Sequence, residues 1–218
     1  MKRIIALLVF LFCLPPYSAG AQESDAYTDI TLSDIGLATV YPSGWTLVTP
    51  DTAARHAALF DGQADPAAEM RAKNVYALAV SPSGDARLSF IAEPGDETAR
   101  LYADIDRYTP AMRTAIKNDF LDKEAWALTG YRYAQAEWTN RSSEGRLLHL
   151  SYTVRYGEET VARGRQVYTI RNALAFTIDL KVTGRTVTSA EEALLAAVVK
   201  RTVFPVCEDM PLLPVGLT

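Results

Sequence analysis

The chain has 218 residues and a formal net charge of −4 at pH 7, with 49% apolar and 22% charged residues. This balance is ordinary for a globular protein and excludes an intrinsically disordered chain. Nucleic acids and anionic membranes attract proteins with a surplus of basic residues, so we expect no nucleic-acid partner.

The first 21 residues predict a secretory signal. Lys2 and Arg3 precede an apolar run at residues 4–14, and a small-residue cleavage site ends at Ala21. The run is shorter than the ~20 residues that a membrane-spanning helix needs. Cleavage after Ala21 would remove two of the 22 basic residues and none of the 26 acidic ones, leaving a net charge of −6. We expect a secreted or periplasmic protein with no stable membrane insertion after cleavage.

Cleavage would leave one cysteine, Cys207, which cannot form an internal disulfide. We interpret it as a small buried apolar side chain, so that the core alone would stabilise the fold; the alternative is a reactive thiol or an intermolecular bridge. The remaining length suits a single domain. We predict a polar lead at residues 22–30, one α+β domain at 31–204 and an extended tail at 205–218.

The tripeptide Pro-Ser-Gly occurs twice, at residues 42–44 and 82–84, each time between two runs of β-forming residues. Proline presets φ at the second position of a turn, and glycine accepts a positive φ. Each copy therefore predicts a β-hairpin. The paired runs are residues 37–41 with 45–49, and 74–80 with 86–92.

Trp45 directly follows the first copy of this turn, where the second copy has Asp85. It alternates with Leu47, as residues on one side of a strand do. We expect Trp45 to fill the core, and we expect Pro42 and Gly44 to have structural roles in the turn.

Helices are expected at residues 51–62, 65–73, 108–130 and 190–202. Asp51 and Asp65 are candidate N-caps of the first two, and Thr109 precedes a proline that suits a first helical turn. Gly130 is a stop signal for the third helix. The last helix has Thr188 or Ser189 as its cap.

Four strands in succession are predicted for the second half of the chain, at residues 131–139, 146–156, 161–171 and 174–182. Alternation is strictest in the second and fourth, where Leu148 and Leu150 flank His149, and Ile178 and Leu180 flank Asp179. Such alternation is typical of antiparallel strands with one buried and one solvated face. Helices placed among these strands indicate an α+β layered domain.

Four stretches share a pattern with a known fold, namely VYPSGW, ARLSFIAEP, GRQVYTIRNALAFTIDLKV and the late RTVF. Together they resemble the Mog/PsbP-like fold, in its exported bacterial branch. The resemblance implies a central antiparallel sheet flanked by helices, an α/β/α sandwich, in a protein that binds a partner and rarely catalyses. The matched positions Tyr41, Pro42, Gly44 and Trp45 are architectural, so no functional residue transfers. The alternative is a helix-grip fold, whose C-terminal helix closes the sheet over an apolar pocket.

Catalytic and metal-binding motifs are absent from the sequence. His56 and His149 have no partner at metal-ligand spacing. The carboxylates of Asp96, Glu97, Asp104 and Asp106 lack the spacing of a calcium loop and are interleaved with arginines, which favours solvated ion pairs. We expect no metal, no cofactor and no enzymatic activity.

Arginines form the most specific candidate site. Arg163, Arg165 and Arg171 alternate onto one face of a strand, and Arg155 on the preceding strand has the parity to lie near them. Guanidinium groups bind carboxylates and phosphates in a bidentate manner, so the row predicts a patch for an anion or a partner. The alternative is a solvated face in which these arginines pair with Glu158, Glu159 or Asp179.

Aromatic residues are also concentrated in these four strands, where they favour cross-strand packing or could line a pocket. They are Tyr131, Tyr133, Trp138, Tyr152, Tyr156 and Tyr168. Our leading hypothesis is an exported, non-enzymatic binding or accessory module that recognises a protein or a small anionic ligand. The alternatives are a small-molecule carrier with an apolar pocket between the sheet and the C-terminal helix, and an enzyme that uses His56 or His149.

Overall fold

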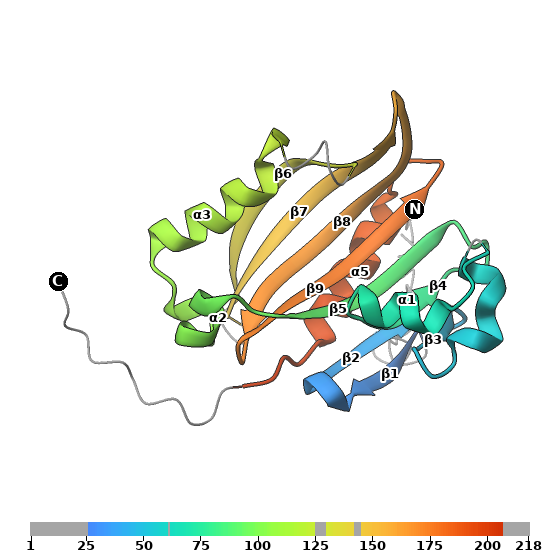
Figure 1. The fold of residues 1–218 in the computed structure, drawn as a ribbon, viewed down its shortest axis with the longest axis horizontal. Coiled ribbons are helices and arrows are strands. Elements are labelled where there is room, and N and C mark those ends of the chain that lie inside the picture. Colours follow the sequence, from blue (N-terminus) through green and yellow to red (C-terminus); the bar gives the residue numbers. More distant parts are fainter. Residues whose placement is uncertain (1–25, 61, 125–129, 142–144, 207–218) are drawn as a thin grey trace, which may run out of the picture.

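The computed structural model describes residues 26–60, 62–124, 130–141 and 145–206. The predicted signal at residues 1–21, Cys207 and most of the predicted tail lie outside the described residues, and the domain bounds stay a prediction. The strands form two antiparallel sheets (Figure 1). The smaller sheet pairs β1 (Tyr27–Leu32) with β2 (Leu37–Pro42).

The larger sheet has seven strands in the order β3-β4-β5-β9-β8-β7-β6. Their bounds are Thr46–Val48 for β3, Val75–Val80 for β4, Ala86–Pro94 for β5, Tyr131–Arg141 for β6, Gly145–Tyr156 for β7, Glu159–Arg171 for β8 and Leu174–Thr183 for β9. The helices are α1 (Pro66–Ala72), α2 (Glu97–Tyr102), α3 (Pro110–Leu121) and α5 (Ser189–Arg201), with short 3-10 helices η1 (Ser33–Ile35), η2 (Ala53–Phe60) and η3 (Ile105–Arg107). None of the helices in the described ranges is long and apolar enough to span a membrane.

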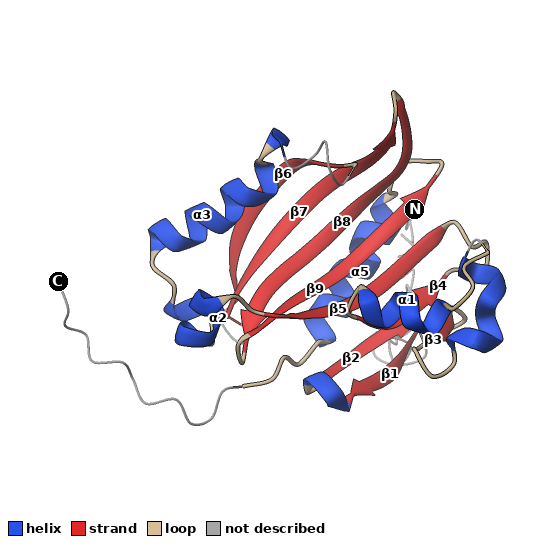
Figure 2. Ribbon diagram, viewed as in Figure 1, coloured by secondary structure: helices blue, strands red, loops and turns tan. Residues whose placement is uncertain are grey.

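Helices cover both faces of the large sheet, as Figure 2 shows. On one face, Val198 and Val199 of α5 join Phe90 and Phe176 of the sheet in the main core, together with residues of the β1–β2 sheet. On the other face, α1 and η2 cover the β3–β4 end, whereas α2 and α3 cover the β6–β8 end. This layering confirms the predicted α+β sandwich with a central antiparallel sheet, in preference to the helix-grip alternative.

The core strands are buried because their apolar side chains alternate against these helical layers. Leu88, Phe90, Leu147, Leu148 and Leu180 are fully buried, and each such side chain stabilises the fold by about 1.5–3 kcal/mol relative to its exposed form. Leu147 and Leu148 are neighbours that point to opposite faces, so β7 buries both of its faces. The expectation of one solvated face per strand is therefore wrong for the middle of this sheet.

The first predicted hairpin is wrong, although its turn is present. The Trp45 amide donates to the Pro42 carbonyl at 3.1 Å and Gly44 has a φ of +84°. The strands that flank this turn belong to different sheets, since β2 pairs with β1 and β3 pairs with β4. The strand β1 begins within residues 22–30, which were predicted as a polar lead, and it was missed because its exposed side chains give no clear apolar alternation.

The second predicted hairpin and the four late strands are confirmed. β4 pairs with β5 across the second Pro-Ser-Gly turn, and β6, β7, β8 and β9 pair in succession. Three predicted caps are also confirmed. The side chains of Asp65, Thr109 and Thr188 accept backbone N–H groups of α1, α3 and α5, and Thr188 forms a capping box with Glu191.

Two helical predictions need correction, and one helix was missed. Residues 53–60 form 3-10 helix with non-helical angles at His56, where we expected an α-helix. The helix α3 ends at Leu121, well before Gly130, and residues 125–129 lie outside the described residues. The helix α2, capped by Asp96, was not expected, because its six residues are too few to show a helical period.

Trp45 is half-buried and packs against the main core cluster. Pro42 is buried at the end of β2, whereas Gly44 is exposed and has open space around it. Positive φ is therefore the feature that requires glycine at position 44. Trp45 thus contributes to the core as a half-buried ring, and the structural roles expected for the three residues stay a prediction.

Candidate functional site

The arginine row lies on β8, but its members have separate partners. The Arg165 guanidinium donates to Glu192 on α5, with Nη2 2.7 Å and Nε 2.9 Å from Oε1. Arg171 is 5% exposed and pairs with Asp104 and Asp106 beside η3. These two guanidinium groups are thus occupied by carboxylates of the protein itself, and none of these three carboxylates was among the partners that the sequence suggested for the arginine row.

Arg155 and Arg163 lie together near the free end of the β7–β8 hairpin. The register places Arg163 opposite Thr153, only two residues from Arg155 along β7. A β-bulge at Val154 and Arg155 shifts the register there, and the Arg155 guanidinium donates to the Glu158 carbonyl in the turn. The predicted row is therefore divided among three places. Arg155 and Arg163 lie near the end of the hairpin, Arg165 lies beside α5, and Arg171 contacts the carboxylates at η3.

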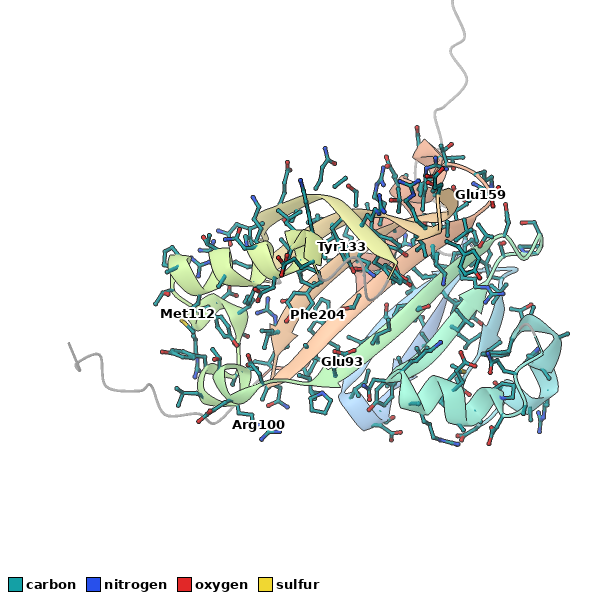
Figure 3. The ribbon with its side chains drawn as sticks, turned by 45° about the horizontal axis from the view of Figure 1, so that its top comes forward. Glu93, Arg100, Met112, Tyr133, Glu159 and Phe204 are labelled. Carbon is teal, nitrogen blue, oxygen red and sulfur yellow. The ribbon has the colours of Figure 1, made fainter. Side chains whose placement is uncertain are left out.

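The end of this hairpin, which we call the hairpin tip, comprises residues 155–163. Figure 1 shows the hairpin extending beyond the neighbouring strand ends, and Figure 3 labels Glu159 there. Tyr156 at the tip is 83% exposed, and Gly157 turns the chain with a φ of +60°. An apolar ring is thus presented to solvent between charged residues of both signs.

Three of the predicted aromatic residues form a packed cluster. The ring centroids of Tyr131 and Tyr133 lie 5.0 and 5.7 Å from that of Tyr152, which is only 2% exposed. Tyr152 lies across β8 above Gly164, where a Cβ atom would overlap its ring. Rings this close leave no room for a ligand between them, so the cluster stabilises the sheet.

The cluster surrounds a buried carboxylate that the sequence placed on a solvated face. Asp179 is 6% exposed and accepts a hydrogen bond of 2.7 Å from the Tyr152 hydroxyl. Tyr133 in turn donates to the Gln166 Oε1 at 3.1 Å. The expected exposure of Asp179 is wrong because Tyr152 reaches it across an intervening strand, a contact that no local pattern could indicate.

Burial sets the ionisation of this cluster. It raises the pKa of Asp179 to about 6, against the lowering effects of Tyr152 and Lys181. Burial and the Asp179 charge raise the pKa of Tyr131 to about 12 and move the pKa of Tyr152 and Tyr133 in the same direction. The phenols therefore remain protonated at neutral pH, and Asp179 is the one member of the cluster that titrates near neutrality.

The two histidines lie apart. His56 occupies the irregular point of η2, whereas His149 is on β7 with its Nε2 3.0 Å from the Thr139 Oγ1. Within the described ranges, no group of three His, Cys, Asp or Glu side chains could hold a metal ion. The expected absence of a cofactor and of enzymatic activity stays a prediction.

The space between α5 and the sheet differs from the apolar pocket of the carrier hypothesis. Leu195, Val198 and Val199 of α5 pack directly into the main core. A groove of about 290 Å³ runs along the α5 flank. Its lining mixes apolar side chains, such as Leu150, Val167 and Leu195, with polar ones, namely Gln135, Glu137, His149, Ser151, Arg165, Gln166 and Glu192.

No protein-family model matches the sequence, and no curated protein matches it. Among solved structures, the chain is similar to cyanobacterial PsbP (CyanoP) from Synechocystis sp. PCC 6803. The two share 16% sequence identity with a TM-score of 0.54, over 88% of this chain and 99% of that chain. The protein therefore has a PsbP-like fold, which confirms the resemblance predicted from its sequence. At this level of identity the similarity shows the fold alone.

Proposed function

We propose that the protein is an exported, non-enzymatic binding or accessory module that docks onto another protein through the hairpin tip. The observation that carries this proposal is the 83% exposure of Tyr156 at the projecting end of a hairpin. Tyrosine and arginine are enriched among the residues that dominate binding at protein interfaces. Tyr156 is the anchor in this proposal, and Arg155 and Arg163 are its polar surround.

The charges at the tip favour a protein over a small anion as the partner. Arg155 and Arg163 lie beside Glu158 and Glu159, so the tip presents both signs of charge. A mixed rim around an aromatic residue suits complementary pairing with another protein surface. A small anion would need converging guanidinium groups, but Arg165 already pairs with Glu192.

The PsbP-like fold and the predicted signal support the remainder of the proposal. Proteins of this fold act as binding or accessory modules in the family resemblance drawn from the sequence. The signal predicted at residues 1–21 would deliver the chain to the periplasm or the medium, so we infer that the partner is an exported or membrane-attached protein.

The test is capture of partners from the exported protein fraction of the native host. Tyr156→Ala should abolish recovery of the partner that the wild-type protein captures, because it removes the aromatic anchor. Leu101→Ala is the matched control, since Leu101 is an apolar side chain that is 53% exposed on α2, far from the tip in sequence. Equal recovery with Tyr156→Ala and wild type would overturn the hairpin as the docking site.

A second variant tests the polar surround. Arg155→Ala/Arg163→Ala should weaken capture and reduce its dependence on salt, because charges at the rim of an interface act through screened electrostatics. An unchanged salt dependence would limit the docking surface to Tyr156.

A further inference from the structure

A cavity of about 460 Å³ lies between α2, α3 and the sheet face opposite α5. Tyr168 and Ile170 of β8 form its floor, and Met112 and Ile116 of α3 form a wall. Its volume is in the range of sites that bind small molecules or side chains. Figure 3 labels Met112 on α3, toward the left of the view, and Glu93 on β5, nearer the middle.

The cavity carries negative charge without a basic counterpart. Glu93, Asp96 and Asp119 line it, and none of its lining residues in the described part of the chain is a lysine or an arginine. None of the ion pairs found within the described ranges involves these three carboxylates. Arg113 lies on α3, as Asp119 does, but it donates to the Tyr108 carbonyl and does not line the cavity.

A buried hydroxyl without a partner also belongs to this cavity. Tyr108 lines it, is 4% exposed, and its hydroxyl has no hydrogen-bond partner in the described part of the chain. Burial, and then Asp96 and Tyr102, raise the pKa of Tyr108 to about 12, so that the phenol is neutral. Leaving such a group unsatisfied costs free energy that a ligand could recover.

The phenol of Tyr168 experiences the same negative potential. Burial raises its pKa, and Tyr108, Asp96 and Glu93 add to the effect. Asp96 therefore raises the pKa of both phenols of the cavity, and Glu93 raises that of Tyr168 alone. Aromatic faces and carboxylates together attract cations.

We propose that this cavity binds an alkylammonium group, either a free alkylamine or the lysine side chain of a peptide. The apolar floor and the α3 wall accommodate the alkyl stem. Asp96 and the Tyr108 hydroxyl accept hydrogen bonds from the ammonium group, which has three N–H donors, and Glu93 and Asp119 add negative charge around the cavity. A metal ion does not suit the site, because the described residues include no group of three acidic, histidine or cysteine side chains that could ligate one.

The proposal is independent of the hairpin tip and is tested on the full chain by NMR titration of backbone amides. Hexylammonium chloride should cause saturable shifts at residues of α2, α3 and the β8 floor. Hexanol, which has the same stem without the charge, should bind at least about tenfold more weakly. Equal affinity for hexanol, or shifts that do not saturate, would overturn the site.

Variants identify the groups that bind the ammonium. Asp96→Asn keeps the helix cap because asparagine also caps, and it should weaken hexylammonium binding about tenfold. Glu97→Gln is the matched control, since Glu97 is the exposed next residue and does not line the cavity. If both variants weakened binding equally, a general surface charge would explain the affinity and the proposal would be wrong.

Tyr108→Phe gives a second readout that does not depend on charge. It removes the unpartnered hydroxyl and keeps the ring, so the ligand-free protein should be at least as stable to heat as the wild type. Hexylammonium should bind it about fivefold more weakly, because one acceptor is lost. Unchanged affinity would remove Tyr108 from the site.

The source of the ammonium group is decided by comparing hexylammonium with N-acetyl-lysine methylamide. Tighter binding of the lysine derivative would assign the cavity to a peptide partner, and tighter binding of hexylammonium would assign it to a free amine. Failure of both to bind would refute the proposal without affecting the docking role of the hairpin tip.

Discussion

Mild acidification should stabilise the protein through Asp179. Its folded-state pKa is about 6, compared with 3.8 for an unperturbed aspartate, because the carboxylate is buried. In this window the folded state takes up a proton that the unfolded state does not. The stability is therefore greatest at low pH and is lost as the pH rises through about 6. Linkage gives a gain of about 1.3 kcal/mol in the free energy of unfolding between pH 7 and pH 5.

The other carboxylates with a shifted pKa titrate below the range from pH 5 to pH 7. Arg185 lowers the pKa of Asp85 to about 2 and also lowers the pKa of Glu191. A carboxylate whose pKa is lowered on folding stabilises the folded state at neutral pH. This contribution is lost only as the pH falls below about 5. The gain between pH 7 and pH 5 therefore reports on Asp179.

The assay is urea unfolding at pH 7, 6 and 5, with the midpoint and slope fitted separately at each pH. Asp179→Asn should remove the gain, because the amide does not titrate but can still accept a hydrogen bond from Tyr152. Asp29→Asn, which changes an exposed residue of β1, should retain it. A flat pH dependence in the wild type, or the same gain in Asp179→Asn, would refute the buried-carboxylate reasoning.

Three substitutions test the packing that holds the fold together, and each is measured as a urea midpoint. Gly164→Ala should destabilise by about 1–3 kcal/mol because its methyl group overlaps the Tyr152 ring; an unchanged midpoint would show that the ring can move. Arg171→Met should cost about 2 kcal/mol, less than for a fully enclosed ion pair because Asp104 keeps contact with water, and a neutral effect would contradict a structural role. Trp45→Ala should cost about 2 kcal/mol, since a half-buried ring loses less than a fully buried one; full stability with lost partner capture would make Trp45 a binding residue.

The sequence predicted those parts of the fold whose signals are local. The late strands have strict alternation, and Thr109 and Thr188 precede their helices with the expected capping chemistry. The strand β1 was missed because its side chains are mostly exposed and polar. The partner of β2 was mistaken because a turn specifies a change of direction and does not specify which strand pairs with which.

The candidate sites were harder to predict, because their contacts join residues that are distant in the chain. The sequence identified Arg155 and Arg163 as potential binding residues, but the partner of Arg165 comes from α5 and is distant in the chain. The α2–α3 cavity depends on a short helix that the sequence did not indicate. Exposure of Tyr156 follows from the length of the hairpin relative to its neighbours, which only the assembled sheet reveals.

The most direct test of the docking proposal is site-specific photo-crosslinking in the native host. A photoreactive phenylalanine derivative at position 156 replaces one exposed aromatic ring with another, and the same derivative at position 101 is the control. Docking through the hairpin tip predicts a discrete cross-linked product from position 156, formed with one exported or membrane-attached protein, and none from position 101. Cross-linking from position 101 alone, or no product from position 156, would contradict docking through the hairpin tip.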